Sequence, residues 1–380
     1  MSDGAPWAVT FLVNSLGVGG AEKHTIQLFN ALDPARFRKS LIYLKPEEQL
    51  LDQVQADAGQ VWCAGFGRGW DVRGLWRLRA RLRDLAPRLL VCVNTYPLFY
   101  GHLARVCGGG HFAIVEIFHS TVLPVGEARK MRCVYRPLFN RSDRVVYVSQ
   151  AQQHYWQARG LPGAGSTCIH NGIDTAHFQD VYDSPQKAAL RQRFGFAASD
   201  FVVGICAALR PEKHHADLLE AIAQLKTRGR PAKCLIIGDG PTRAEVEARI
   251  DALGLRDDVA ITGFQDDVRP CVAICDCMAI VSHLVETFSI AALEAMAMGK
   301  PLLMSDVGGA REQVEHGVHG FVFPAGDVRL IADALREMQS PGVVKRMGAA
   351  ARQRVLANFH CSRMLCRYAD VFAAVSSRRP

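Results

Sequence analysis

Residues 201–240 read FVVGICAALR-PEKHHADLLE-AIAQLKTRGR-PAKCLIIGDG and contain one full unit of the pattern on which the chain is built. The apolar runs Phe201–Cys206 and Lys233–Ile237 predict two buried strands. The segment Lys213–Lys226 is predicted to contain a helix, because its apolar residues share one stripe: Leu218, Leu219, Ile222 and Leu225. A strand, a helix and a second strand in this order favour a parallel strand pair with the helix on one face.

The same alternation extends over the rest of the chain. Before this segment we predict the strands Trp7–Val13, Leu41–Leu44, Leu89–Val93, Phe112–Phe118 and Arg144–Val148 and the helices Ala21–Leu32 and Leu75–Leu85. After it we predict the strands Val259–Ile261, Cys277–Val281 and Leu302–Ser305 and the helices Thr242–Leu253 and Ile290–Met298. The alternation predicts an α/β fold with two doubly wound, Rossmann-like parallel sheets that face an interdomain cleft. Ligands in such folds bind beyond the carboxyl ends of the strands.

The boundary between the two sets of elements falls where the pattern loosens. Asp180–Pro185 is predicted to be a linker, so the domains would comprise residues 1–183 and 184–360. Helical periodicity returns at Cys361–Val375, and we expect a terminal helix, residues 361–380, to complete the first domain.

The composition is that of a globular protein: 380 residues, 49% apolar and 22% charged. No apolar run approaches the roughly 20 residues of a membrane span, and the N-terminus lacks a signal-peptide pattern. Twelve scattered cysteines suit reduced thiols, so we expect a cytoplasmic protein. Cys271, Cys275 and Cys277 lack a second pair at zinc spacing, and we predict no metal site.

Positive charge is concentrated in one window, residues 60–160, with 15 Arg and Lys against five Asp and Glu. Such a surface suits nucleic acid, an anionic membrane or phosphorylated substrates. We find no nucleic-acid recognition motif, and Arg73–Arg83 forms a basic amphipathic helix that carries Trp76. We therefore predict peripheral attachment to the anionic inner face of the plasma membrane. A merely solvated arginine-rich face is the alternative.

Two glutamates, Glu286 and Glu294, flank the start of the predicted helix Ile290–Met298, which ends at Gly299 and Pro301. The free backbone amides of the first helical turn form an anion site. Phosphate on these amides, with a carboxylate on each side for hydroxyl groups, would hold a phosphorylated sugar. The alternative is an ordinary amphipathic helix with two solvated glutamates.

Other candidate site residues lie in loops that follow predicted strands. A glycine loop that includes Gly19 and Gly20 would allow close approach of a ligand or form a tight turn. His119 ends a strand and is either a site residue or a hydrogen-bonded structural histidine. Lys213 would place an ammonium on a diphosphate unless it is simply solvated, and Asn171 begins a turn between the domains.

These segments resemble the GT-B-fold glycosyltransferases of family 4. The most specific part is Glu286–Glu294 followed by Ala-Met-Ala-Met-Gly-Lys-Pro. Further similar blocks are Gly19-Gly-Ala-Glu22, Asn171-Gly-Ile-Asp174, Gly238-Asp-Gly-Pro241, Gly308-Gly-Ala-Arg-Glu312 and Gly320-Phe-Val-Phe323. The absence of any Asp-x-Asp motif argues against a sugar transferase that holds Mg²⁺ through it.

The resemblance implies a metal-independent, retaining transfer of a hexose or N-acetylhexosamine from a UDP- or GDP-sugar. The acceptor would be a glycan, a polyprenyl-linked sugar or a growing lipopolysaccharide or exopolysaccharide, received by the N-terminal domain. The catalytic residues would be Glu286 and His119, which contact the transferred sugar. The donor would be held by Lys213, Arg210, Glu294, Phe288, Ser289, Ile290, Gly19, Gly20, Gly238 and Asn171.

One position departs from the family pattern. The family carries an arginine five residues before the lysine, and this chain has Ala208 there. A guanidinium can span diphosphate oxygens and an alanine cannot. We hypothesise that Arg210 compensates.

Two other classes of function stay open on the sequence. An epimerase of the same fold would interconvert a UDP-sugar without an acceptor, and a phosphorylase would need inorganic phosphate or pyridoxal phosphate. A non-catalytic scaffold or sugar-nucleotide sensor would keep the fold without turnover, which Ala208 favours and the retained candidate residues oppose.

Overall fold

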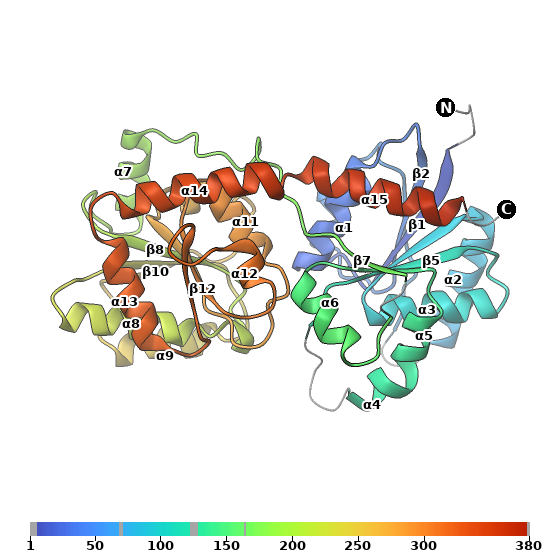
Figure 1. Ribbon diagram of the computed structural model, residues 1–380, viewed down its shortest axis with the longest axis horizontal. Coiled ribbons are helices and arrows are strands. Elements are labelled where there is room, and N and C mark those ends of the chain that lie inside the picture. Colours follow the sequence, from blue (N-terminus) through green and yellow to red (C-terminus); the bar gives the residue numbers. More distant parts are fainter. Residues whose placement is uncertain (1–5, 68–70, 122–127, 163–164, 378–380) are drawn as a thin grey trace. The chain divides into compact units, whose positions relative to one another are not determined.

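The computed structural model describes residues 6–67, 71–121, 128–162 and 165–377. It divides into two compact units, unit 1 with Met1–Asn171 and Ser362–Pro380 and unit 2 with Gly172–Cys361 (Figure 1). Arg68 and Glu127 of the basic window lie outside the described residues.

The described part of unit 1 has a seven-stranded parallel sheet with the order β3-β2-β1-β4-β5-β6-β7. The strands are β1 Trp7–Val13, β2 Phe37–Tyr43, β3 Gln60–Cys63, β4 Leu89–Val93, β5 Ala113–Phe118, β6 Arg144–Tyr147 and β7 Ser166–Cys168. The α-helices are α1 Gly20–Ala31, α2 Val72–Leu85, α3 Thr95–Val106, α4 Ala128–Lys130, α5 Arg136–Asn140, α6 Gln150–Gln157 and α15 Cys361–Ser376. A 3-10 helix, Leu51–Gln53, and a π-helical segment, Met131–Tyr135, complete the list.

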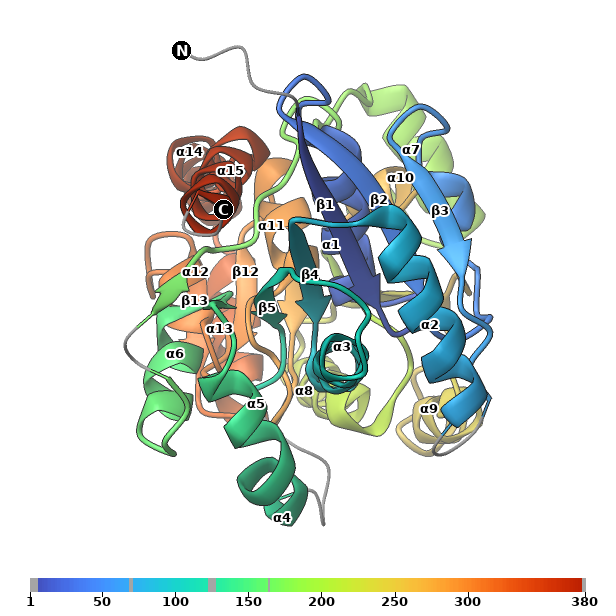
Figure 2. The same ribbon diagram turned by 90° about the vertical axis from the view of Figure 1, so that its right-hand side faces the viewer.

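Helices cover both faces of this sheet because the central strands are apolar on both faces. On one face α2 and α3 pack side by side, and α3 also contacts α5 (Figure 2). Leu78 and Leu82 of α2 are fully buried there against the sheet. On the other face Phe11 of β1 packs edge-on against Phe29 of α1 and Phe372 of α15.

The described part of unit 2 has a six-stranded parallel sheet with the order β10-β9-β8-β11-β12-β13. The strands are β8 Val202–Cys206, β9 Lys233–Ile237, β10 Val259–Ile261, β11 Cys277–Ile280, β12 Leu302–Ser305 and β13 Gly320–Phe323. The helices are α7 Ser184–Arg193, α8 His215–Thr227, α9 Arg243–Ala252, α10 Arg269–Ala273, α11 Ile290–Ala297, α12 Ala310–Gln313, α13 Val328–Met338 and α14 Val343–Asn358, with a 3-10 turn, Pro211–Lys213. The predicted fold class, two doubly wound parallel sheets, is confirmed.

The structure corrects one predicted boundary. Asp180–Pro185 is not wholly a linker, because α7 begins at Ser184 with a capping box in which Asp183 and Gln186 exchange side-chain and backbone hydrogen bonds. The helix predicted within Lys213–Lys226 is confirmed as α8, which begins at His215 because His214 has a left-handed conformation.

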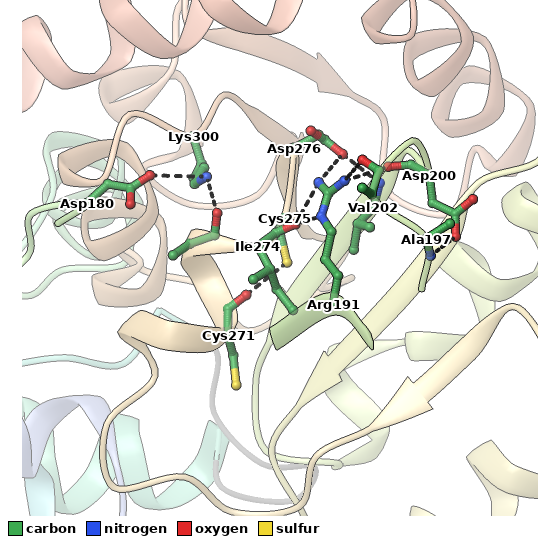
Figure 3. Close-up of polar contacts among 12 residues, drawn as sticks. Asp180, Arg191, Ala197, Asp200, Val202, Cys271, Ile274, Cys275, Asp276 and Lys300 are labelled. Carbon is green, nitrogen blue, oxygen red and sulfur yellow. Dashed lines mark hydrogen bonds and ion pairs between the residues drawn. The ribbon is translucent and has the colours of Figure 1, made fainter. Parts of the chain in front are cut away.

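A polar cluster anchors α7 to the unit 2 sheet (Figure 3). The Arg191 guanidinium donates to the carbonyls of Ile274, Ala198 and Asp200 and to the Asp276 carboxylate, at 2.8–3.0 Å. Asp276 also accepts from the Val202 amide at the start of β8. One arginine therefore ties α7, β8 and the turn before β11 together.

The cysteines of this region are buried thiols. Burial raises the pKa of Cys234 to about 12 and raises the pKa values of Cys275 and Cys277 further. The Cys275 thiol donates to the Cys271 carbonyl at 3.2 Å, as Figure 3 shows. These thiols stay protonated, which makes them unreactive.

We expect Arg191→Ala to lower the free energy of unfolding of unit 2 by about 2–4 kcal/mol, since it removes the donor of the part-buried Ile274 and Asp200 carbonyls and leaves Asp276 with only the Val202 amide. Denaturant unfolding of the full chain measures this change. Arg193→Ala, at an exposed position of the same helix, is the control. Equal stability of the two variants would contradict the anchoring role.

Candidate functional site

The predicted site residues of unit 2 gather at the carboxyl edge of its sheet. Lys213 follows β8, Gly238 follows β9, and Glu286 lies in the loop between β11 and α11. The strand order reverses between β8 and β11, which makes this edge a topological switch point, where ligands bind in open α/β sheets.

Lys213 and Glu286 form an ion pair, with 2.8 Å between Nζ and Oε2. Their side chains are 25% and 13% exposed, so the pair is accessible to a ligand but screened less than a surface pair. The Ser282 hydroxyl donates to the same carboxylate oxygen at 3.2 Å. Sequence reasoning did not single out Ser282, and a hydroxyl four residues before a site glutamate is too common a feature to signal it.

The backbone at Glu286 is fixed by a close approach of the loop after β12. Gly308 has a φ of +59°, and a Cβ at this position would lie 1.8 Å from the Glu286 carbonyl oxygen. The Gly309 amide donates to the Thr287 carbonyl at 2.9 Å. Only glycine fits at position 308, because any side chain would collide with the Glu286 backbone. Gly308 and Gly309 therefore hold the backbone at Glu286 in place.

The start of α11 is held by two side chains. Ser289 is its N-cap and accepts from the Ala292 amide at 3.3 Å. Gln313 accepts from the Ser289 amide at 3.0 Å and donates to the Ser289 carbonyl at 2.8 Å. The Ser289 amide is thus engaged within the protein, and the first-turn amides of Ile290 and Ala291 are the ones without an intrahelical acceptor. The sequence does not indicate this role of Gln313, because Gln313 lies 24 residues from Ser289 and no local pattern links the two.

The remaining donor-site candidates of unit 2 differ in exposure. Glu294, on α11, is 6% exposed, and Phe288 is 4% exposed with its ring against Phe359. Gly238 has a φ of +144°, and a Cβ there would lie 2.2 Å from the Ala207 carbonyl oxygen. Gly238 therefore allows the loop after β9 to pack closely on the loop after β8. Arg210 is exposed at the start of the 3-10 turn.

In unit 1, His119 follows β5 at the carboxyl edge of the sheet. Its amide donates to the Asn94 side-chain oxygen at 2.9 Å, and Asn94 has a φ of +69°. The His119 ring lies 4.8 Å from the buried ring of His24 on α1. Burial and then His24 lower the pKa of His119 well below its usual value, so the imidazole is neutral at pH 7.

The other candidates of unit 1 are Gly19, Gly20 and Asn171. Gly19 is the N-cap of α1, and Gly20 is the first helical residue. A Cβ on Gly19 would lie 2.2 Å from a carboxylate oxygen of Glu22, so this glycine leaves room for that side chain. Asn171 follows β7 and is 3% exposed. Figure 2 shows β1 and α1, and the loop that joins them ends at Gly19.

Two family profiles match most of the chain. "Glycosyl transferases group 1" matches residues 186–354 and "Glycosyltransferase Family 4" matches residues 18–177. The chain belongs to the group 1 glycosyltransferases. Its fold is therefore GT-B, and the prediction of a glycosyltransferase is confirmed.

Named relatives are similar over about two thirds of this glycosyltransferase. N-acetyl-alpha-D-glucosaminyl L-malate synthase of Bacillus anthracis is 28% identical over 71% of the chain and 70% of its own length. A GDP-mannose-dependent alpha-(1-6)-phosphatidylinositol monomannoside mannosyltransferase of Mycobacterium tuberculosis is 28% identical over 66% of the chain and 65% of its own length. The alignments thus leave about a third of each relative unmatched.

The solved structure of Anabaena Alr3699/HepE with UDP and glucose is similar over 96% of this chain and 99% of that one. The TM-score is 0.84 and the sequence identity is 25%. Among the described residues of the glycosyltransferase, no helix has both the length and the apolar character needed to cross a bilayer.

The buried His24 predicts acid sensitivity of unit 1 of the glycosyltransferase. Burial lowers the pKa of His24 to about 4 from the 6.5 of an unconstrained histidine. Between these values the unfolded chain binds more protons than the folded one, so stability falls as pH falls. By pH 4 this histidine alone would cost about 3 kcal/mol.

Denaturant unfolding of wild type and His24→Phe between pH 7 and pH 4 tests this expectation. The variant should lose about 3 kcal/mol less over this range. His111→Ala, at an exposed position, should follow wild type. An unchanged pH dependence in His24→Phe would refute the assignment.

Proposed function

We propose that the chain is a retaining glycosyltransferase that uses a nucleotide-diphosphate sugar and needs no metal ion for transfer. The observation that supports this best is the Lys213–Glu286 ion pair at the carboxyl edge of the unit 2 sheet. A cation, a carboxylate and the amides at the start of α11 suit the diphosphate and the hydroxyl groups of such a donor.

The proposed reaction gives each of these groups a role. The bond between the sugar C1 and the diphosphate oxygen breaks, and the diphosphate keeps the electron pair. C1 bonds to an acceptor hydroxyl oxygen, whose proton passes to the leaving diphosphate. Lys213 and the amides of Ile290 and Ala291 stabilise the negative charge on the leaving diphosphate, in place of a metal ion. Glu286 contacts the hydroxyl groups of the transferred sugar, and Glu294 binds the ribose.

Lys213 and Glu286 are already in place in the protein without a donor. Lys213 is paired with Glu286 until a donor binds, and the diphosphate then offers Lys213 a second anionic partner. Ser282 and Gly308 keep the carboxylate in place through the side chain and the backbone, respectively. We propose that Arg210, exposed in the same turn as Lys213, supplies the second cation that Ala208 lacks.

Supporting roles are proposed for the other candidates. Phe288, Ser289 and Gly238 shape the loops that receive the donor, and Asn171 lines the site. In unit 1, Gly19 and Gly20 admit the acceptor and the donor phosphate. His119, as a neutral imidazole, hydrogen-bonds the transferred sugar.

The donor is proposed to be a UDP- or GDP-sugar carrying a hexose or N-acetylhexosamine. The Anabaena structure contains UDP and glucose, and the mycobacterial relative is named for GDP-mannose and a phosphatidylinositol acceptor. We propose a lipid-linked or polysaccharide acceptor, and the glycolipid in the name of the mycobacterial relative supports the lipid-linked kind. A thermal-shift screen with UDP-, GDP- and ADP-sugars identifies the donor, because a ligand of the folded state raises its stability.

Lys213→Met and Glu286→Gln should each lower the rate of nucleoside diphosphate release from the preferred donor by about 100-fold or more. Each removes one partner of the ion pair but keeps the side-chain volume. Lys226→Met, at the opposite end of α8, is the control and should retain activity. The reaction should proceed in the presence of a chelator, and proton NMR of the product should show the donor's anomeric configuration.

Other outcomes would select another function. Near wild-type turnover in Lys213→Met or Glu286→Gln would refute the proposed donor site. A new epimer formed from a UDP-sugar alone would indicate an epimerase, and donor binding without turnover would indicate a sensor. Unchanged donor affinity in Arg210→Ala would remove Arg210 from the site.

We propose that unit 1 attaches peripherally to the inner face of the plasma membrane through α2. Leu78 and Leu82 are buried, whereas Val72 and Trp76 are 62% and 55% exposed. Arg73 and Arg83 are exposed on the same helix. An exposed aromatic side chain among arginines suits an anionic lipid interface.

Part of the positive charge of α2 serves the fold itself. Arg77 donates to the carbonyls of Ala64 and Gly65, and Arg79 donates to that of Cys107. The acceptor of Arg79 is neutral, whereas Arg77 also lies 3.9 Å from the Asp71 carboxylate, which offsets part of its charge. The proposal therefore relies on the electrostatic field of the whole helix and on Trp76 as the apolar contact.

Co-sedimentation with liposomes tests the membrane proposal. Wild type should bind vesicles of anionic phospholipid more than vesicles of phosphatidylcholine, and salt should weaken this binding. Trp76→Ser with Arg73→Gln and Arg83→Gln should abolish it. The control replaces an exposed aromatic residue and two exposed arginines of unit 2: Phe264→Ser with Arg230→Gln and Arg346→Gln. Equal, negligible binding to both vesicle types would refute the proposal.

A further inference from the structure

Three side chains able to bind metal ions meet beside Lys213 in unit 2. His214 and Asp217 come from the turn before α8 and from its first turn, and His283 comes from the loop after β11. One ligand atom of each residue lies within 4.8 Å of the other two. The donor site proposed above uses none of them.

The contacts within this group are close. His283 Nε2 lies 2.5 Å from Asp217 Oδ2, and the rings of His214 and His283 stack with 3.3 Å between centroids and 8° between planes. A metal ion lies in the plane of each imidazole that binds it, so the two rings turn out of this parallel stack when an ion binds. Neutral imidazole is the form that binds a metal ion.

Backbone conformation and backbone hydrogen bonds fix the positions of the three residues. His214 has a left-handed conformation, with φ and ψ both 47°, which is uncommon for a residue other than glycine. The Asp217 amide donates to the His214 carbonyl, and the His283 amide donates to the Glu212 carbonyl at 3.3 Å. A backbone conformation of higher energy that orients a side chain is typical of functional positions.

The three side chains have the donor atoms that one class of metal ion favours. Two imidazoles and one carboxylate are donors that Zn²⁺ and related divalent transition metals favour. Three protein ligands leave one position of a tetrahedral site for water or an anion. The side chains of His283 and Asp217 are 27% and 14% exposed, so an ion can reach them from solvent.

We propose that His214, Asp217 and His283 bind one divalent transition-metal ion of the Zn²⁺ type. This inference goes beyond the proposed transfer, in which no step uses a metal. The ion links the start of α8 to the loop between β11 and α11, and that loop also carries Glu286. Its occupancy therefore limits the motion of the donor-site loop.

The test uses tag-free, full-length protein that has been treated with a chelator and then titrated with Co²⁺. Cobalt replaces zinc in such sites, and its visible absorption bands report nitrogen and oxygen ligands in tetrahedral geometry. We expect saturation at one Co²⁺ per chain and displacement by Zn²⁺. Absence of a saturable spectrum in wild type would overturn the proposal.

Two variants assign the ligands. His214→Gly removes one imidazole and suits the left-handed backbone, so it should fold like wild type. It and His283→Ala should each weaken Co²⁺ binding at least tenfold. His177→Ala, which removes an exposed histidine of the same unit, should bind like wild type. Wild-type affinity in both His214→Gly and His283→Ala would overturn the assignment.

The same titration separates this proposal from the proposed function. Metal binding is measured without donor or acceptor, and transfer is measured in chelator. Absence of metal binding in wild-type protein that still catalyses transfer would overturn only the metal site. Metal binding by a protein that turns over no donor would leave the site intact and refute only the transferase proposal.

Discussion

Parallel strand pairing is the constraint on which both units depend. Each strand of the described sheets runs parallel to its neighbours, so a helix must return the chain to the same starting edge. All loops that follow strands therefore gather at one edge. In unit 2 this brings together the loops that carry Lys213, Gly238, Glu286 and Gly308, although up to 95 positions separate them in the chain. The loops approach closely because glycine occupies the contact points.

Opposite charge then organises the edge that parallel pairing creates. Lys213 and Glu286 are partly shielded from water, so their attraction exceeds that of an exposed pair. The Ser282 hydroxyl and the Gly308 backbone hold the carboxylate, while Gln313 holds the start of α11. The cation and the carboxylate therefore have defined positions before a ligand arrives, which lowers the entropic cost of binding.

The His214, Asp217 and His283 group depends on the same loops. The left-handed residue that delays the start of α8 also turns an imidazole towards the loop after β11. The left-handed conformation of His214 thus both sets the start of α8 and places its ring against His283 in a distant loop. On unit 1, by contrast, the arginines of α2 are divided between bonds to the protein's own carbonyls and exposed positions.

The sequence by itself determined the alternation of strands and helices, the switch-point loops and most candidate site residues. These follow from local periodicity and from residue types that need no partner to be recognised. Only the tertiary structure decided that Glu286 pairs with Lys213 across 73 positions, that Gln313 engages the Ser289 amide, and that Gly308 packs on the Glu286 backbone. It also moved the start of α7 into the expected linker. The physical reason is that these contacts depend on strand register and on packing between distant segments, which local patterns do not encode.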